Sequence, residues 1–363
     1  MNKLNELLQE TIDDVDRIEN ILGGFKDSTE IKRIAERYPI KVTPYYLSLI
    51  DRSTLDDPVR KMCIPTAFEY SDGGEEDTSG ESSNTVIRGM QHKYHETVLI
   101  LSTNQCAMYC RHCFRKRLVG LSSDEIATFI PEMVEYIKKH KEVNNVLITG
   151  GDSFMLSNEV IKKYLESFSK LENIQFIRFG TRIPVVLPKR IYEDEELLEL
   201  LKEYGKIKQI AVVTQFNHPH EITEESAKAI KALNKAGCFV RNQTVMLKGV
   251  NDNPKVLAEL MNRLVSKGVI PYYVFQCRPV KGVLNQFQVP IRKSLKIIDR
   301  AKSMMNGQAK SFHYVMSHPT GKIEIIGEDE NGSVIFKYHQ AKNDADQNRI
   351  FKRDLGENQS WLE

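Results

Sequence analysis

The chain has 363 residues, of which 41% are hydrophobic and 28% are charged, and its formal net charge is +2. It can therefore bury a large core, and it is not a nucleic-acid-binding tail. The N-terminus carries charges throughout, unlike a signal peptide, and no later segment is apolar for long enough to span a bilayer. We expect a cytoplasmic protein that binds neither nucleic acid nor membrane.

Residues 1–93 are predicted to form a helical segment that ends in an exposed loop. The loop is expected over residues 70–85, "YSDGGEEDTSGESSNT", which are acidic, rich in Gly and Ser, and almost without large apolar side chains. This segment precedes the first strongly apolar run of the chain.

Residues 94–306 alternate six times between strand-like runs and helical patterns. The runs are "TVLILST", "NVLITG", "IQFIRFG", "QIAVVTQ", "FVRNQTVML" and "PYYVFQC". The first helical pattern contains Ile126 and Ile137 and follows a Ser122/Glu125 capping-box signature, and later helices are expected near 157–170, 194–204, 223–236, 254–267 and 291–305. Six such units predict a parallel α/β sheet covered outside by helices, either doubly wound or curled into a barrel.

Residues 307–363 are expected to form a separate cap or arm. Three short strand-like runs, "FHYVMS", "KIEIIG" and "SVIFKY", precede a polar tail over residues 340–363. The tail is expected to dock on a neighbouring subunit or on the barrel of its own chain.

Polar motifs follow the predicted strands of residues 94–306. They are the cysteine-rich loop, "GGDS", "GTRIP", "QFNHP" and "QCRP". In either parallel architecture the carboxyl ends of the strands meet at one rim, where the functional site lies. We therefore expect these motifs to converge.

The loop after the first strand, "CAMYCRHCFRKR", contains Cys106, Cys110 and Cys113. In a large chain without a signal peptide, disulfides are not expected. The basic neighbours argue against coincidental core cysteines, because a buried apolar loop does not tolerate unpaired charges. A zinc site needs a fourth ligand, for which His112 is a candidate, whereas three cysteines on a cubane iron–sulfur cluster leave one iron open. A distant fourth ligand, such as Cys63 or Cys277, also stays open.

The spacing C-x3-C-x2-C after such a strand resembles that of radical S-adenosylmethionine (SAM) enzymes, in which the open iron binds SAM. The wider set "CAMYCRHCFRKRLVG", "TGGDSFMLS", "GTRIPVVLPKRI", "QFNHPHEITEES", "RNQTVMLKGVNDNPKVL" and "PYYVFQC" is similar to the lysine 2,3-aminomutase family. The resemblance implies a TIM-like (βα)6 partial barrel and a [4Fe-4S] cluster on the three cysteines. It also implies that Gly150, Gly151, Asp152 and Gln243 bind SAM.

The same resemblance implies pyridoxal phosphate (PLP), because these aminomutases move an α-amino group to the β-carbon through a deoxyadenosyl radical and a PLP imine. Lys322 in "VMSHPTGKIEI" is the candidate catalytic lysine that forms the Schiff base. Tyr94 corresponds to a tyrosine that binds the cofactor. The family's phosphate-binding arginine falls at Thr97 and a ring-contacting tyrosine at Phe275, and Lys93 offers compensating charge.

For the substrate, the resemblance implies that Arg115 meets the α-carboxylate. The two aspartates that receive the lysine ammonium fall at Arg278 and at about Ser317. A guanidinium there opposes a lysine substrate and favours an acidic one such as glutamate.

Two other functions stay open. One is a PLP-independent radical SAM enzyme that acts on another small molecule or on a protein lysine. The other is a non-enzymatic iron–sulfur or zinc protein, which would not need the polar strand ends. The family resemblance further implies an electron donor such as flavodoxin or ferredoxin and a homo-oligomer. Lysine-type enzymes bind zinc through a cluster of C-terminal cysteines, and because the tail has no cysteine we expect no zinc site in it.

Overall fold

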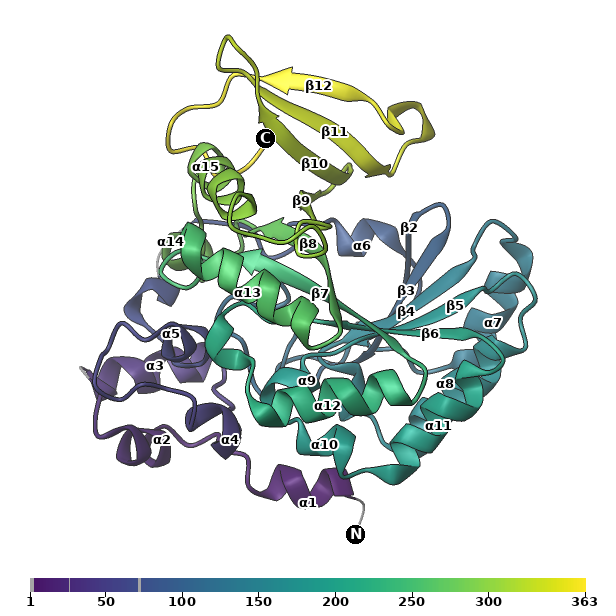
Figure 1. Cartoon of the computed structure of the whole chain (residues 1–363). Helices are drawn as coiled ribbons and strands as arrows, with labels where there is room; N and C mark the ends of the chain where they lie inside the picture. The colour runs from purple at the N-terminus through teal and green to yellow at the C-terminus, as the bar shows by residue number, and fades with distance from the viewer. Residues whose placement is uncertain (1–2, 26, 71–72) are drawn as a thin grey trace.

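The computed structural model describes residues 3–25, 27–70 and 73–363, and its twelve strands form one sheet in chain order (Figure 1). The strands are β1 (Thr85–Ile87), β2 (Met90–Tyr94), β3 (Thr97–Thr103), β4 (Asn145–Gly150), β5 (Phe176–Gly180), β6 (Gln209–Thr214), β7 (Phe239–Met246), β8 (Val269–Gln276), β9 (His313–His318), β10 (Gly321–Glu328), β11 (Val334–Ala341) and β12 (Ile350–Arg353). Among the described residues β1 does not pair with β12, so the sheet stays open.

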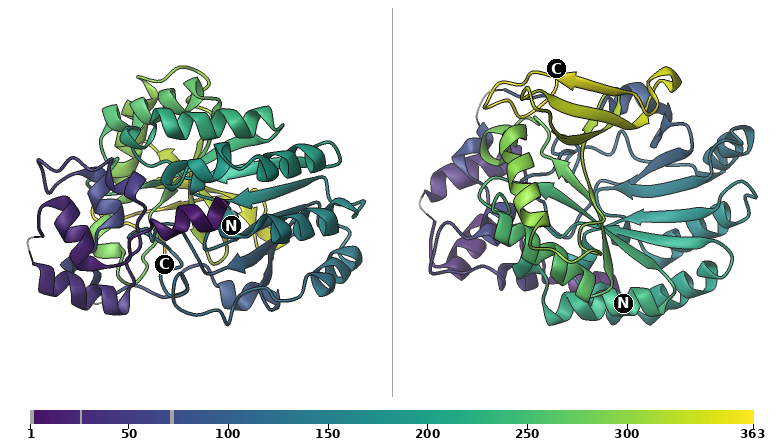
Figure 2. Two further views of the ribbon diagram at one scale, coloured as in Figure 1. Left: turned by 90° about the horizontal axis from the view of Figure 1, so that it is seen from below. Right: turned by 45° about the horizontal axis from the view of Figure 1, so that its top comes forward.

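Strands β3 to β8 are the six predicted strands, and they pair with one another in parallel. The main helices between them are α7 (Ile130–Lys139), α8 (Asn158–Ser169), α11 (Glu195–Gly205), α12 (Glu224–Lys235), α13 (Pro254–Ser266) and α15 (Ile291–Lys302). Short helices lie in the loops: α9 (Ile183–Val186), α10 (Lys189–Tyr192) and α14 (Leu284–Phe287). Figure 2 shows helices along the outside of a curved sheet, so the predicted α/β partial barrel is confirmed. No described helix is long and apolar enough to cross a membrane.

Helix α7 begins later than its sequence pattern predicts. The expected capping box is wrong, because the Ser122 hydroxyl accepts from Asp124 N–H at 3.1 Å while Glu125 forms an ion pair with Arg117. The helix instead begins at Ile130, with a proline in its first turn. Proline is tolerated there because the first N–H groups of a helix have no intrahelical partner.

The N-terminal part of the chain is helical. Its helices are α1 (Lys3–Gln9), α2 (Val15–Leu22), α3 (Ser28–Arg37), α4 (Pro44–Leu47) and α5 (Pro58–Cys63). Short polar side chains cap several of them, as Asp27 does for α3 and Thr43 for α4. The Thr43 hydroxyl also donates to Val186 O at 2.6 Å, which ties this segment to the barrel. The strands β1 and β2, which the sequence pattern does not indicate, continue the sheet from β3 in antiparallel order.

The expected exposed loop over residues 70–85 is found only in part: residues 73–76 are exposed, whereas Thr78, Ser79, Glu81 and Asn84 are buried, and residues 71 and 72 lie outside the described part. Glu81, which begins the short helix α6 (Glu81–Asn84), is only 5% exposed. Its carboxylate pairs with Arg115 at 2.8 Å and with Arg117 at 2.9 Å. Two guanidinium partners offset the cost of desolvating the carboxylate and hold the segment against the barrel.

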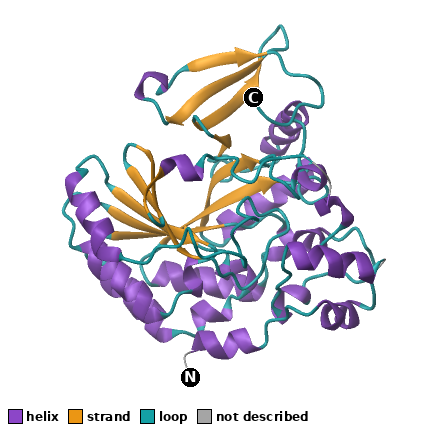
Figure 3. Cartoon of the chain, turned by 180° about the vertical axis from the view of Figure 1, so that it is seen from behind, coloured by secondary structure: helices purple, strands orange, loops and turns teal. Residues whose placement is uncertain are grey.

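The C-terminal strands continue the barrel sheet. β9 pairs in parallel with β8, and β10, β11 and β12 follow as antiparallel neighbours above the barrel (Figure 3). The tail docks on its own chain, because Gln276 Nε2 donates to Ser360 O at 2.9 Å and Leu362 is buried. The division at residues 93/94 and 306/307 stays a prediction, since sheet pairing crosses both boundaries.

Candidate active site

One cavity of about 350 Å³ lies where the barrel strands end, and it reaches onto β2, β7 and β10. The residues predicted from the sequence all line this cavity: Tyr94, Cys106, Cys110, Cys113, Arg115, Gly150, Gly151, Asp152, Gln243, Arg278 and Lys322. The strand topology explains their convergence, because the carboxyl ends of parallel strands share one edge. Their individual roles remain predictions.

The three cysteines of the loop after β3 are partly buried free thiols. Burial raises the pKa of Cys106 well above its ordinary value and the pKa of Cys113 to about 11, and neighbouring cysteines add to both shifts. Thiols that oppose one another's ionisation are held as thiolates by a cationic metal centre. The donor set therefore fits an iron–sulfur cluster, whose ligands are cysteine thiolates.

The positions of these sulfurs argue against a single ion. In the described ranges, two groups of His, Cys, Asp or Glu residues have three ligand atoms within 4.8 Å of one another. Neither group contains a cysteine, so the three sulfurs are not all within 4.8 Å of one another. Tetrahedral ligands of one zinc ion lie about 3.8 Å apart when the zinc–sulfur distance is about 2.3 Å. A cluster spreads its ligands over different irons, so the wider spacing fits a cluster.

The other ligand candidates differ in position. His112 lines the cavity, but its Nε2 lies 3.3 Å from Gln215 Oε1 and 3.2 Å from Asn217 Nδ2, which tie the ring to the loop after β6. Cys277 also lines the cavity, whereas the Cys63 thiol donates to the backbone oxygen of Val59 in helix α5. Of the two distant cysteines, Cys277 is therefore the one at the site.

Gly150 and Gly151 support the cysteine loop. A Cβ atom on Gly150 would lie 2.3 Å from Thr103 O, and one on Gly151 would lie 2.3 Å from Gln105 O. Both oxygens belong to the backbone that leads into the first cysteine. Glycine is therefore required here so that the end of β4 can approach that backbone closely.

Asp152 connects the loops after β4 and β5. Its carboxylate accepts from Thr181 Oγ1 at 2.5 Å and from Arg182 N–H at 2.6 Å, and burial raises its pKa although these bonds oppose the shift. Arg182 was not singled out from the "GTRIP" string, yet its Nη1 donates to Cys110 Sγ at 2.9 Å and its guanidinium pairs with Glu221. Such an outer contact orients a ligand sulfur and tunes the metal centre.

Arg115, predicted to bind the substrate carboxylate, already has a carboxylate partner. Its Nε donates to Glu81 Oε1 at 2.9 Å and its Nη1 to Gly150 O at 3.2 Å. Burial favours a raised pKa for Glu81, but Arg115, Arg278 and Arg117 together hold that pKa below its ordinary value. No local pattern in the acidic segment indicated this contact.

Arg278 is a partly buried cation in the wall of the cavity. Its Nη1 donates to Ser79 Oγ at 2.8 Å, and its guanidinium carbon lies 4.0 Å from the centroid of the Phe114 ring. Burial lowers the pKa of Arg278 to about 10, with Glu81 opposing the shift and Arg115 adding to it. Ser317, near the second position that is acidic in lysine-specific relatives, lines the same cavity without a charge.

Lys322 on β10 is partly buried and lines the cavity. Its Nζ donates to Gln340 Oε1 at 2.9 Å and lies 4.4 Å from the centroid of the Tyr273 ring. Burial lowers the pKa of Lys322 to about 7, and nearby cations add to the shift. A large part of this amine is therefore unprotonated at neutral pH, as a nucleophilic lysine requires. The preceding Gly321 is needed because a Cβ atom there would lie 2.3 Å from Gln340 O.

Positive charge accumulates around Lys322. Burial lowers the pKa of Lys93 to about 7, and Arg278 adds to the shift. Arg178 on β5 lines the cavity, and its buried Nε has no hydrogen-bond partner among the described residues. The Tyr94 ring lies 5.6 Å from the amines of both lysines. Because unpaired buried cations are costly, this region fits an anionic group such as a cofactor phosphate.

The sequence is similar to known proteins along most of its length. The sequence profile of the Radical SAM superfamily matches residues 100–261. L-lysine 2,3-aminomutase from Methanococcus maripaludis is 39% identical over 328 residues, which cover 88% of this chain and 74% of that protein. The corresponding enzyme from Clostridium subterminale is 38% identical over 300 residues, covering 82% and 71%. This chain belongs to the lysine 2,3-aminomutase family of radical SAM enzymes.

Family membership confirms the predicted resemblance and the enzyme class, an isomerase of the aminomutase type. Radical SAM enzymes use a [4Fe-4S] cluster, SAM and a reductant, and the lysine 2,3-aminomutase family adds PLP, as predicted. The relatives also include glutamate 2,3-aminomutase from Clostridioides difficile, 35% identical over 317 residues that cover 86% of this chain and 74% of that protein. Since the named relatives act on both lysine and glutamate, membership leaves the substrate to the residues of the cavity.

Proposed function

We propose that the protein is a radical SAM 2,3-aminomutase that moves the α-amino group of glutamate, or of a similar acidic amino acid, to the β-carbon. The observation that carries the proposal is a cavity that joins the three cysteines to the Lys322 amine and several guanidinium groups. When bound, SAM at the cluster supplies the radical that takes a hydrogen atom from the β-carbon, and PLP carries the migrating nitrogen.

Different residues of the chain would hold the cluster, SAM and PLP. Cys106, Cys110 and Cys113 would hold the cluster, and Gln243 with the loop 150–152 would position SAM beside it, because all of them line the cavity. Both Asp152 oxygens already accept hydrogen bonds, so an ammonium group would share an oxygen with Thr181 or Arg182. Lys322 would bind PLP covalently, with Tyr94 and Lys93 beside it.

The charges of the cavity favour an acidic substrate. Six of its lining residues have basic side chains: Lys93, Arg115, Arg178, Arg182, Arg278 and Lys322. Its two carboxylates, Glu81 and Asp152, are already engaged by the protein. A substrate ammonium about 4 Å from the Arg278 guanidinium would be repelled by about 4 kcal/mol at an effective dielectric constant of about 20. A side-chain carboxylate in that place is attracted instead.

An amino-acid panel tests the proposal. Anaerobically reconstituted protein with SAM, PLP and dithionite is expected to convert glutamate to the isomer that carries its amino group on C3, as measured by NMR. Glutamate turnover should exceed lysine turnover by at least about tenfold, which corresponds to about 1.4 kcal/mol of the expected charge discrimination. Lysine turnover at a rate comparable with glutamate would contradict the assignment.

Arg278→Asp tests the pocket residue directly. The loss of a charge-assisted hydrogen bond of about 1.5–3 kcal/mol is expected to lower kcat/KM for glutamate by about 10–150-fold and to relax discrimination against lysine. Arg52→Asp is the charge-matched control, because Arg52 is exposed and does not line the cavity. Selectivity that is the same in wild type and Arg278→Asp would place Arg278 outside the substrate pocket.

The proposal extends to the surroundings of the enzyme. We propose a cytoplasmic homo-oligomer that receives electrons from a flavodoxin or a ferredoxin. The six cysteines are all free thiols, which fits a reducing compartment. Analytical ultracentrifugation would measure the oligomeric state, and turnover with each purified donor would identify the reductant.

A further inference from the structure

Three side chains with metal-binding atoms meet on neighbouring strands of the C-terminal sheet. They are His313 on β9, Glu324 on β10 and His339 on β11, and one candidate ligand atom from each lies within 4.8 Å of the others. His313 Nδ1 is 2.7 Å from Glu324 Oε1, and the two imidazole centroids are 5.2 Å apart. These residues do not line the cavity of the candidate active site.

The sheet itself creates this arrangement. Lys322 pairs with Gln340 while Ile323 pairs with Tyr338, so His339 is an extra residue in β11. Such a bulge re-aims the side chain of the extra residue. It brings the His339 ring toward Glu324 and Tyr273. Ligands on hydrogen-bonded strands are held more rigidly than ligands on loops.

A chain of hydrogen bonds engages one ring nitrogen of His339 and leaves the other free to bind an ion. Its Nε2 lies 2.7 Å from the Tyr273 hydroxyl oxygen, and the Tyr273 hydroxyl donates to Tyr272 at 3.1 Å. Because Tyr273 uses its hydrogen for Tyr272, Nε2 of His339 donates to Tyr273 and Nδ1 keeps its lone pair. Histidines that bind metals commonly donate their second ring N–H in this way.

We propose that His313, Glu324 and His339 bind one divalent transition-metal ion of the zinc class. Two imidazoles and one carboxylate are a zinc-type donor set with one position left for water, whereas calcium and magnesium prefer oxygen ligands. The ion ties β9, β10 and β11 together. It thereby fixes the strand that carries Lys322, whose amine lies 4.4 Å from the Tyr273 ring centroid. Only this last consequence rests on the proposed function.

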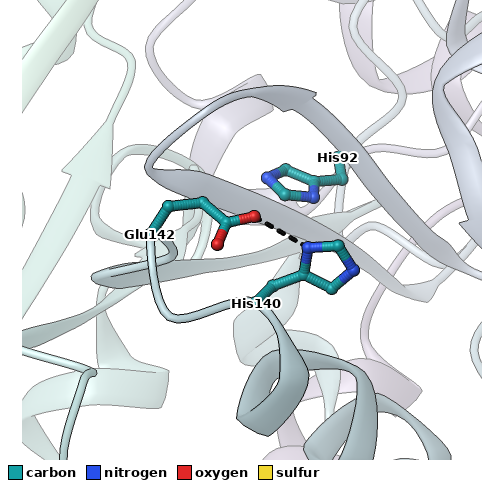
Figure 4. A group of neighbouring side chains, drawn as sticks. All are labelled: His92, His140 and Glu142. Atoms are coloured by element: carbon teal, nitrogen blue, oxygen red, sulfur yellow. Dashed lines mark hydrogen bonds and ion pairs between the residues drawn. The ribbon is translucent and has the colours of Figure 1, made fainter.

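A second group of this kind, His92, His140 and Glu142, is less suited to an ion (Figure 4). His92 already uses both ring nitrogens, Nδ1 with the Tyr136 hydroxyl at 2.9 Å and Nε2 with His95 O at 3.1 Å. His140 Nδ1 contacts Glu142 at 2.7 Å. An ion on His92 would have to displace a hydrogen bond, so this group serves as the internal control.

Equilibrium dialysis of the cluster-loaded full chain against zinc chloride tests the site, with zinc and iron counted by mass spectrometry. Loading the cluster first keeps the three cysteines from binding zinc. The wild type is expected to hold one zinc per chain in addition to the cluster iron. His339→Ala and the gentler Glu324→Gln are expected to weaken zinc binding by at least about tenfold, whereas His92→Ala should leave it unchanged.

Three results would overturn the site. They are wild-type protein that binds no zinc, full binding by both His339→Ala and Glu324→Gln at unchanged iron content, or an equal loss in His92→Ala. Circular dichroism and iron content show whether each variant is folded, and Glu324→Gln stands in if His339→Ala is not. Zinc is counted without any turnover, so a failure of the aminomutase proposal would leave this result unaffected.

Discussion

Alanine at Cys106, Cys110 or Cys113 is expected to abolish cleavage of SAM to 5′-deoxyadenosine. Each of these cysteines lines the cavity, and the loss of one thiolate removes a ligand that no other cysteine in the same loop replaces. Loss of an outer partner of a metal site costs about 10–100-fold, so loss of a direct ligand should exceed about 100-fold. Anaerobic incubation with dithionite, followed by chromatography of 5′-deoxyadenosine, measures the effect.

Cys238→Ala is the matched control for these variants, because Cys238 is a free thiol buried in the hydrophobic core and does not line the cavity. It should keep its iron content and its SAM cleavage. A folded variant of any of the three loop cysteines with full activity would end the cluster assignment.

Lys322→Ala is expected to eliminate covalent attachment of PLP. Desolvation and nearby cations lower the pKa of the Lys322 amine to about 7, so a reactive unprotonated amine is available near neutral pH. Borohydride reduction of the reconstituted protein with PLP, followed by peptide mass spectrometry, should find a pyridoxyl group on Lys322 in the wild type. The variant should carry none and should lose aminomutase turnover.

Lys93→Met separates the attachment point from the charge around it. Lys93 lies beside the same Tyr94 ring, and its replacement removes a neighbouring cation without touching the Lys322 amine. We expect the adduct to remain on Lys322 while more PLP is needed to form it. No adduct on any lysine of the wild type, together with intact SAM cleavage, would instead support a PLP-independent enzyme that acts on another small molecule or on a protein lysine.

The strands and most helices of the barrel could be predicted because their signals are local. Apolar runs mark β3 to β8, and amphipathic spacing marks the helices between them. The start of α7 was missed because Glu125 makes an ion pair with Arg117 instead of a helix cap. The strands β1 and β2 are short, so they contain too few residues to show the alternation of apolar and polar side chains that marks a strand.

The candidate site was predictable where motifs follow strands. The cysteine loop, the glycine pair and Arg278 each come after a strand of the parallel sheet, so topology alone brings them to one rim. Glu81 was not predictable, since its segment has the composition of an exposed loop. The position of Arg182 at the end of a strand indicated that it lies at the site, but only the structure shows its contact with the Cys110 sulfur.

The sequence by itself determined the parallel α/β sheet, the cysteine spacing and the resemblance to the family, which implied the barrel, because strand and helix periods and short motifs depend on residues close together in the chain. Only the tertiary structure decided that Glu81 pairs with Arg115, that cations outnumber free carboxylates in the cavity, and that His313, Glu324 and His339 meet. Burial and charge pairing depend on which distant segments come into contact. A local pattern does not contain that information.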